Sequence, residues 1–182
     1  MRVISGIAKG RKLKSPQSAR PLTDRVKEAL FNILQGVVEG TKFLDLFAGC
    51  GQVGIEALSR GAELALFVEN NRKNVAVIKE NLEATGLAEK AKVFPGDAAR
   101  AISSLASQGY FFDYIYLGAP YESPDLIKCL TKLGEVKLGK LIIAEHRKQQ
   151  QLEKVYGQLQ EIRQNQYGET TLTFYETSNI SG

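Results

Sequence analysis

A strand–turn–helix signature in the first third of the chain limits the possible folds more than any other feature. An apolar run from Phe43 to Leu46 leads into a glycine turn, and a helical pattern begins directly after it. Gly49, Gly51 and Gly54 have the spacing G-x-G-x-x-G, which is typical of a βα unit that holds a nucleotide. Such a unit predicts an α/β domain with a parallel sheet.

Two acids indicate which nucleotide the turn would hold. Glu69 lies about twenty residues after Gly49, where an acidic side chain can bind a ribose. Asp45 lies four residues before Gly49, beside the helix N-terminus that would hold a diphosphate. A carboxylate there repels a diphosphate, but it attracts the cationic sulfonium and ammonium groups of S-adenosylmethionine. The pattern therefore favours a methyl donor, and a NAD-dependent oxidoreductase is a minor alternative.

Strand and helix patterns alternate along the chain. Strands are expected at 42–47, 64–68, 92–94, 113–117 and 140–145, and helices at 24–35, 53–60, 71–84, 98–107 and 123–133. The C-terminal part has two further strand patterns, Leu159–Gln164 and Thr171–Tyr175, joined by a polar turn. We therefore expect an α/β fold, a doubly wound and mostly parallel Rossmann-like sheet of seven strands that ends in an antiparallel hairpin.

The first 20 residues form a basic segment. They contain six basic residues and no acid, whereas the whole chain has a net charge of +4, so the remainder carries −2. Such a segment on a near-neutral body is typical of proteins that bind a phosphate backbone, and a solvated flexible terminus is the alternative. We expect residues 1–36 to form a basic arm and helix that contact nucleic acid, and residues 37–182 to form the cofactor-binding domain.

The composition argues against several other classes of protein. No apolar run approaches the roughly 20 residues of a membrane span, and the N-terminus lacks the apolar core of a signal peptide. Two cysteines do not make a disulfide framework, and a single histidine argues against a metal cluster. We expect a cytoplasmic protein with reduced thiols and no membrane or metal partner.

The expected strand ends carry polar or glycine residues, and ligands of a doubly wound sheet bind at those ends. These positions are Asp45 with the glycine turn, Glu69–Asn70, Gly96–Asp97–Ala98, and Gly118–Ala119–Pro120–Tyr121. One acid of this kind could merely cap the following helix. Acids at three successive strand ends, together with the turn, indicate a binding site.

Three further side chains have competing interpretations. Cys50 has no neighbouring base that would activate it as a nucleophile, so a small residue in a tight turn is the better interpretation. For His146, at the end of the fifth expected strand, we favour a structural role over a catalytic one. Tyr121 could either stack on an extruded base or simply cover the cofactor.

Taken together, these residues resemble a bacterial family, the RsmD-type 16S ribosomal RNA guanine-N2 methyltransferases. The glycine turn is generic to methyltransferases, whereas the segment from Arg20 to Leu34 is more specific. The resemblance covers nearly the whole chain, and the segments that carry it are 1–6, 9–13, 20–34, 44–51, 54–62, 67–69, 96–98, 145–146 and 167–170.

The resemblance implies a class I methyltransferase that moves a methyl group from S-adenosyl-L-methionine to a guanine of 16S rRNA in the small ribosomal subunit, and we expect it to act as a monomer. The residues that would hold the cofactor are Asp45, Phe47, Ala48, Gly49, Cys50, Gly51, Glu69, Asn70, Asp97 and Ala98. Among them, Asp45, Gly49 and Gly51 would line the methionine part, Glu69 the ribose, and Asp97 with Ala98 the adenine. The residues that would contact RNA are Arg2, Lys9, Arg11, Lys12, Lys14, Arg20 and Arg25.

The fourth strand end departs from the family pattern. The catalytic loop of the family is Asp-Pro-Pro-Tyr, whereas this chain has Gly118, Ala119, Pro120 and Tyr121. The family's carboxylate would accept a hydrogen of the guanine amine, and Gly118 supplies none. Three hypotheses follow: slow catalysis, replacement of the carboxylate by a residue elsewhere, or a cofactor- and RNA-binding assembly protein that no longer methylates. If the loop limits the rate, Gly118→Asp should raise it.

Overall fold

The computed structural model describes residues 1–15, 22–34 and 38–178. The helices are α1 Asp24–Ile33, α2 Gln52–Ser59, α3 Arg72–Thr85, the short 3-10 helix η1 Ala88–Lys90, α4 Ala98–Ser107 and α5 Asp125–Glu135. The strands are β1 Lys42–Leu46, β2 Leu64–Glu69, β3 Ala91–Pro95, β4 Phe112–Leu117, β5 Gly139–Arg147, β6 Val155–Tyr156, β7 Leu159–Tyr167 and β8 Thr170–Thr177.

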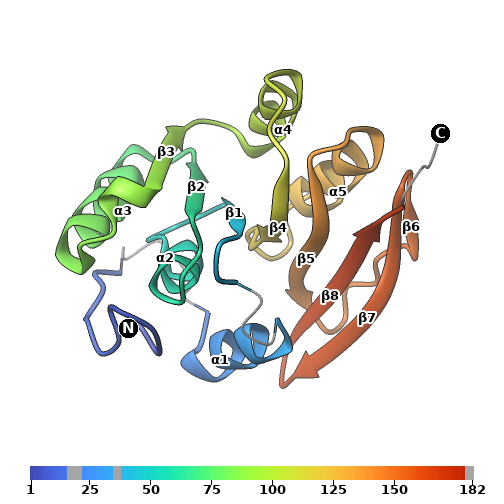
Figure 1. Cartoon of the computed structure of the whole chain (residues 1–182). Coiled ribbons are helices and arrows are strands. Elements are labelled where there is room, and N and C mark those ends of the chain that lie inside the picture. Colours follow the sequence, from blue (N-terminus) through green and yellow to red (C-terminus); the bar gives the residue numbers. More distant parts are fainter. Residues whose placement is uncertain (16–21, 35–37, 179–182) are drawn as a thin grey trace.

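All the described strands belong to one sheet of order β3-β2-β1-β4-β5-β8-β7-β6 (Figure 1). The first five are parallel, and β8 pairs antiparallel with both β5 and β7. From β1 the chain winds outward to β3, then returns to β4 on the other side of β1 and continues to β5. The sheet therefore reverses its winding between β1 and β4, and ligands bind at such a reversal, beyond the carboxyl ends of the strands.

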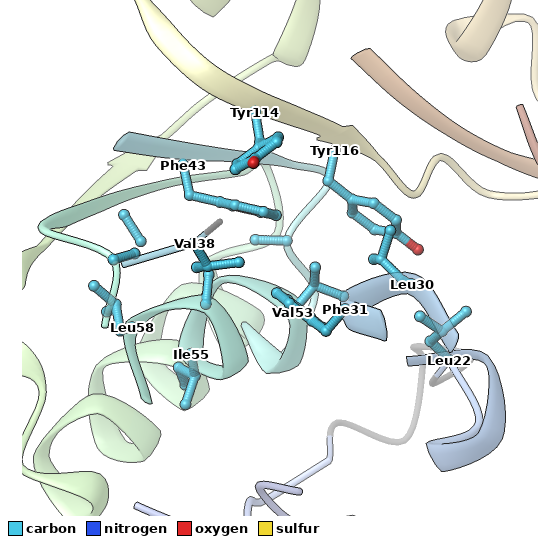
Figure 2. Close-up of a cluster of buried hydrophobic side chains, with 14 of the residues drawn as sticks. Leu22, Leu30, Phe31, Val38, Phe43, Val53, Ile55, Leu58, Tyr114 and Tyr116 are labelled. Carbon is cyan, nitrogen blue, oxygen red and sulfur yellow. The ribbon is translucent and has the colours of Figure 1, made fainter. Parts of the chain in front are cut away.

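Two apolar clusters cover the two faces of the sheet. Alternate residues of one strand enter opposite clusters: Phe43 of β1 packs with α1 and α2, and Leu44 packs with α4 and α5. Figure 2 shows the first cluster, in which Phe43 packs with Phe31 of α1 and Val53 of α2. Because both faces are covered by helices, the run Leu64–Val68 of β2 is apolar throughout, as expected for a strand buried on both sides.

The α/β class, the parallel core and the C-terminal antiparallel pair are confirmed, but two details differ from expectation. Within the described residues the sheet has eight strands instead of the expected seven, because the two-residue strand β6 is too short to leave a periodic pattern. The β7–β8 pairing also continues closer to the turn than expected. Its last pair is Tyr167 with Thr170, so only Gly168 and Glu169 remain in the turn. Gly168 has a φ of +59°, which suits a tight hairpin connection.

The first helix ends at Ile33, two residues before the expected end, and Gln35 lies outside the described residues. Thr23 caps this helix as its sequence suggests, since the Thr23 side chain accepts a hydrogen bond from the amide of Val26. Val26 and Leu30 of this helix are buried in the first apolar cluster.

The N-terminal segment is packed against the domain, which contradicts the alternative of a solvated terminus for residues 1–15. An antiparallel bridge joins Arg2 and Lys12, and Val3, Ala8 and Leu13 are buried in the same cluster as α2. Asn81 of α3 accepts a hydrogen bond from the amide of Lys14 at 2.8 Å, and its own amide group donates to the Lys14 carbonyl. Residues 1–15 and α2 therefore share one core.

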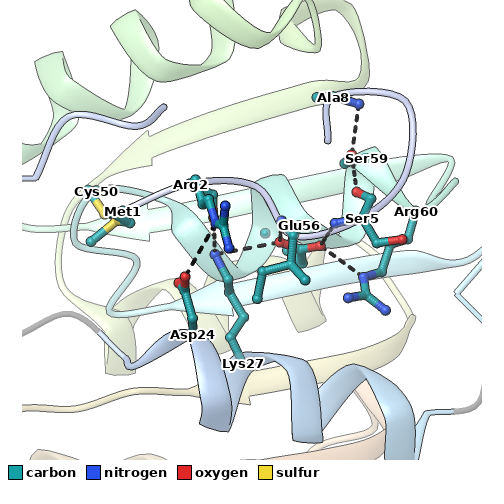
Figure 3. Close-up of polar contacts among 12 residues, drawn as sticks. Met1, Arg2, Ser5, Ala8, Asp24, Lys27, Cys50, Glu56, Ser59 and Arg60 are labelled. Carbon is teal, nitrogen blue, oxygen red and sulfur yellow. Dashed lines mark hydrogen bonds and ion pairs between the residues drawn. The ribbon is translucent and has the colours of Figure 1, made fainter. Parts of the chain in front are cut away.

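A buried ion pair joins this segment to two helices (Figure 3). Lys27 of α1 and Glu56 of α2 are both fully buried, with 3.5 Å between Lys27 Nζ and Glu56 Oε1. Glu56 also accepts hydrogen bonds from the amides of Ile4 and Ser5, and Lys27 Nζ donates to the carbonyl of Arg2 at 2.8 Å. The pair thus ties residues 2–5, α1 and α2 together.

Candidate active site

The turn between β1 and α2 has an unusual backbone. Gly51 adopts a φ of +84°, as expected for a glycine in a nucleotide-binding turn, and Phe47 adopts a φ of +61° although it carries a side chain. A non-glycine residue in this region costs about 1–2 kcal/mol, and such residues cluster at functional sites. A Cβ at Gly54 would lie 2.3 Å from the Phe67 ring, so glycine is required for α2 to pack closely on β2.

Asp45 is a buried carboxyl group beneath this turn. Its Oδ2 accepts a hydrogen bond from the amide of Gly54 at 3.0 Å. Burial raises the pKa of Asp45 well above 3.8, the negative charges of Glu69 and Glu145 add to the rise, and the Gly54 hydrogen bond opposes it. An unpaired carboxylate at this depth is costly, and a cation beside it would remove much of that cost.

Glu69 is oriented by two backbone amides at the end of β2. Its Oε1 accepts from Gly49 at 3.0 Å and its Oε2 accepts from Asn71 at 3.1 Å. Each carboxylate oxygen has a second lone pair, so both can still accept a hydroxyl hydrogen. The geometry suits a ligand with two neighbouring hydroxyl groups.

These acids open onto one cavity of about 450 Å³ at the point where the sheet reverses its winding. Most of the expected site residues line it: Asp45, Phe47, Ala48, Gly49, Cys50, Glu69, Asn70, Gly118, Ala119, Pro120 and Tyr121. Gly51, Asp97 and Ala98 do not line it. Among its described lining residues, Arg147 is the single basic side chain, against the four acids Asp45, Glu69, Asp125 and Glu145.

Two buried amide side chains in the lining have an oxygen atom without a partner among the described residues. Gln52 Oε1, in the first turn of α2, and Asn74 Oδ1, in the first turn of α3, have no hydrogen-bond donor in the part of the chain that the structure describes. Buried acceptors of this kind are costly unless a bound molecule satisfies them. The cavity therefore fits a cationic ligand that is rich in hydrogen-bond donors, such as the ammonium group and ribose hydroxyls of S-adenosylmethionine.

Asp97 lies outside the cavity lining. Its Oδ2 accepts from the amide of Arg100 at 3.0 Å and so caps α4, whereas Ala98 is the first residue of that helix and is buried. This is the capping role that the sequence raised as the alternative for a strand-end acid. Because a carboxylate has two oxygens, capping leaves the second able to accept a hydrogen bond.

The fourth strand end brings two tyrosines and a glutamate together. Tyr116 donates to Glu145 Oε2 at 2.5 Å, and Tyr121 donates to Glu145 Oε1 at 2.9 Å. Burial raises the pKa of Tyr116 well above 10, and the negative charge of Glu145 is the second contribution to this rise. The Tyr116 hydroxyl therefore remains protonated and stays a donor. The Tyr121 hydroxyl also lies 3.1 Å from Thr170 Oγ1, and the Arg147 guanidinium lies 5.4 Å from the centre of the Tyr121 ring.

Cys50 and His146 have the surroundings of structural residues. Burial raises the pKa of the Cys50 thiol, which lies 3.3 Å from the sulfur of Met1. His146 is almost fully buried, and burial lowers its pKa. Its Nδ1 contacts the Arg147 carbonyl at 2.9 Å and its Nε2 contacts Thr173 Oγ1 at 2.7 Å, so both ring nitrogens are occupied.

The expected RNA-binding side chains are exposed wherever they are described: Arg2, Lys9, Arg11, Lys12, Lys14 and Arg25. Arg20 lies outside the described residues. Two of the others have acidic neighbours, since Lys14 pairs with Glu80 at 2.7 Å and Arg2 lies 3.7 Å from Asp24. Exposed pairs of this kind are weak, so they leave these side chains available to a phosphate.

Sequence reasoning did not assign several residues of the cavity lining to the site, among them Gln52, Asn74, Glu145 and Arg147. Gln52 directly follows Gly51 and could have been found from that position. Glu145 and Arg147 flank His146 on β5, and their period-two spacing places both on the face opposite to His146. No local pattern marks Asn74, whose partnerless oxygen appears only in the folded chain.

The doubly wound sheet with its glycine turn and C-terminal antiparallel strands is the fold of S-adenosylmethionine-dependent methyltransferases of known structure. A family model described as conserved hypothetical protein 95 matches residues 1–176, and the chain belongs to this family, the RsmD family of methyltransferases. The resemblance inferred from the sequence is thereby confirmed.

Relatives of the family match most of the chain. A Bacillus subtilis protein provisionally named rRNA methyltransferase YlbH is 40% identical over 181 residues, 97% of this chain and 98% of the relative. Ribosomal RNA small subunit methyltransferase D of Haemophilus influenzae is 33% identical over 158 residues, 84% of this chain and 81% of the relative. The structure of the provisionally named methyltransferase yhhF from Escherichia coli matches this chain with a TM-score of 0.84 and 32% identity. The match covers 98% of this chain and 98% of the relative.

The described residues contain no group of His, Cys, Asp and Glu side chains that could hold a metal ion. In the same residues, no helix has the length and apolar character needed to cross a membrane.

Proposed function

We propose that the cavity binds S-adenosylmethionine and that the protein transfers a methyl group to the N2 amine of a guanine in the 16S rRNA of the small ribosomal subunit. The observation that carries the cofactor part is the excess of acids in the cavity lining. A dinucleotide would bring a diphosphate to this site, and the buried Asp45 would repel it. When bound, the cofactor supplies an activated methyl group on a positively charged sulfur.

The contacts of the lining suggest how the chain would hold this donor. Asp45 would face its cationic groups beside Phe47, Ala48, Gly49, Cys50 and Gly51, and Glu69 with Asn70 would accept the ribose hydroxyls. Gln52 and Asn74 offer further acceptors. We propose that Asp97 and Ala98 contact the adenine ring of the donor, through the second carboxylate oxygen of Asp97 and the first backbone amide of α4.

The acceptor part of the proposal rests on the relatives named as rRNA methyltransferases and on the exposed basic side chains of the arm. Phosphate contacts from these side chains would orient the RNA without reading its sequence. The backbone carbonyl of Gly118 or Ala119 would accept one guanine amine hydrogen, with Pro120 shaping the loop. Tyr121 offers an aromatic face for stacking on an extruded base.

Mass spectrometry of small-subunit rRNA tests the whole proposal. Unmodified subunits are incubated with the protein and isotopically labelled S-adenosylmethionine, and the expected product is one labelled N2-methylguanine. Label on another atom or base would correct the acceptor. Tight binding of donor and RNA without any product would instead support the second candidate, an assembly protein that has lost catalysis, which the absence of a carboxylate at Gly118 favours.

We further propose that the protein is located in the cytoplasm and acts as a monomer. Cys50 and Cys129 are both buried free thiols, which suits a reducing compartment. Light scattering of the purified protein measures the oligomeric state directly.

A further inference from the structure

The site has a carboxylate at the fourth strand end although Gly118 carries no side chain. A Cβ at Gly118 would lie 3.4 Å from Glu145 Oε2 and 2.9 Å from Cε1 of Tyr116. Glu145 reaches this point from β5, the parallel neighbour of β4. The first atom of a side chain at position 118 would therefore already meet the Tyr116 ring and the Glu145 carboxylate.

We propose that Glu145 is the catalytic carboxylate of this protein and that it accepts a hydrogen of the guanine N2 amine in place of a side chain at position 118. The proposal rests on the function proposed above. It assigns to one residue the hydrogen-bond acceptor that this reaction needs and that the 118–121 loop lacks.

Two phenol groups fix the Glu145 carboxylate in one orientation. Tyr116 holds Oε2 at 2.5 Å, and Tyr121 holds Oε1 at 2.9 Å. Glu145 is 9% exposed and lines the cavity, so it is shielded from bulk water and open to a ligand. A fixed acceptor in a water-poor site stabilises a developing positive charge more strongly than a mobile one, because it needs no reorganisation.

The carboxylate retains capacity for the substrate. Each oxygen accepts one phenol hydrogen and has a second lone pair. One amine hydrogen would go to Glu145 and the other to the carbonyl of Gly118 or Ala119, which directs the N2 lone pair away from both. N2 then forms the bond to the methyl carbon, the donor sulfur keeps the electron pair of the broken bond, and N2 releases one proton, which Glu145 is placed to take.

The other three acids of the lining are already engaged elsewhere. Asp45 lies under the glycine turn and accepts from Gly54. Glu69 lies at the end of β2, where its oxygens accept from the amides of Gly49 and Asn71, and the proposed function assigns it to the ribose. Asp125 accepts from the Ser123 hydroxyl at 2.8 Å. Glu145, by contrast, accepts a hydrogen bond from Tyr121 of the 118–121 loop.

The test compares Glu145→Gln with a matched variant, Glu122→Gln. Glu122 directly follows the 118–121 loop, but its side chain is 76% exposed and it does not line the cavity. We expect Glu145→Gln to lower kcat by about 10²-fold, with little change in the dissociation constant of S-adenosylmethionine or in the melting temperature. Glu122→Gln should leave all three values unchanged.

A binding measurement separates contact with the amine from a structural role. Short RNAs carry either guanosine or inosine, which lacks the N2 amine, at the position that mass spectrometry identifies. With S-adenosylhomocysteine present, the wild-type protein should prefer the guanosine RNA by about 10- to 100-fold, the range for a hydrogen bond to a charged group. Glu145→Gln should lose most of this preference.

The outcomes distinguish this inference from the function on which it depends. A wild-type protein that forms N2-methylguanine, with Glu145→Gln retaining its rate and its preference for guanosine, would overturn the role of Glu145 alone. A wild-type protein that forms no methylguanine would overturn the proposed function, and the role of Glu145 with it.

Discussion

At the scale of single residues, Asp45 combines a cost in stability with a role in binding. Burial raises its pKa well above 3.8, and Glu69 and Glu145 add to the rise. A carboxyl group whose pKa is higher in the folded than in the unfolded state stabilises the fold fully below its unfolded pKa. That contribution is lost as the pH rises through the folded pKa. At neutral pH the free protein therefore carries a destabilising group that a cationic ligand would relieve.

We expect Asp45→Asn to weaken binding of S-adenosylmethionine without lowering stability at neutral pH. One charge pair at about 4–6 Å contributes about 3–4 kcal/mol at an effective dielectric of about 20, so an increase in Kd on the order of 100-fold is expected. Titration calorimetry measures the affinity, and thermal unfolding measures the stability. An unchanged Kd would contradict the role given to this acid.

The same group predicts a pH dependence of binding. Because the cationic ligand favours the ionised form, the affinity should rise with pH through the raised pKa of Asp45, with release of a proton on binding. Calorimetry in buffers of different ionisation enthalpy measures the proton. Asp45→Asn should abolish both effects, and a pH slope that persists in this variant would point to another group.

Gly118 gives a further prediction, and the structure changes the expectation drawn from the sequence. An added Cβ would lie 2.9 Å from the Tyr116 ring, which is buried and held by Glu145. An aspartate would also place a second carboxylate beside Glu145. We therefore expect Gly118→Asp alone to lower both stability and rate, whereas Gly118→Asp combined with Glu145→Gln should recover part of the rate lost in Glu145→Gln. A faster single variant would falsify this account.

At the scale of elements, the buried Lys27–Glu56 pair holds residues 2–5, α1 and α2 together. Arg60 also contacts Glu56 Oε2 at 2.9 Å (Figure 3). Glu56 thus serves two amides and two cations, whereas Lys27 relies on Glu56 and one carbonyl. We therefore expect the loss of Glu56 and the loss of Lys27 to lower the free energy of unfolding by different amounts.

We expect Glu56→Ala to lower the free energy of unfolding by about 3–5 kcal/mol, because it leaves Lys27 buried without a counter-ion. Residues 1–15 should also exchange their amide hydrogens faster, since Ile4 and Ser5 lose their acceptor. Lys27→Met, which leaves Glu56 paired with Arg60, should cost clearly less. Urea unfolding and hydrogen exchange measure the two effects, and equal losses in both variants would contradict the proposed asymmetry.

At the scale of the whole molecule, charge is divided between an acidic cavity and basic surface residues of the arm. Lys9, Arg11 and Lys12 are exposed, and they lie in a segment fixed to α2 and α3. Acids in the cavity suit a cationic donor, and bases on the arm suit a polyanion. The two binding events should therefore be separable by mutation.

Replacing Lys9, Arg11 and Lys12 with Gln should weaken RNA binding and leave the Kd of S-adenosylmethionine unchanged. Each lost phosphate contact should reduce the slope of log K against log salt by about 0.7–0.9. The matched control replaces three exposed lysines of the α5–β5 region, Lys128, Lys137 and Lys140. A control that weakens binding equally would mean that total charge, and not the arm, governs the interaction.

The sequence alone determined the central strand–turn–helix unit, the alternation that makes the sheet parallel, and the acids Asp45 and Glu69 in the site. These features depend on residues close together in the chain, where periodicity and turn chemistry decide the structure. The family could also be inferred, because its segments extend over nearly the whole chain.

Only the tertiary structure decided that residues 1–15 are packed, that β6 extends the sheet, and that Asp97 caps a helix outside the cavity. It also decided that Glu145, 27 positions after Gly118 in the chain, lies beside it. The physical reason is that burial, pairing across strands and unsatisfied polar atoms arise from contacts between distant residues. A local sequence pattern does not predict those contacts.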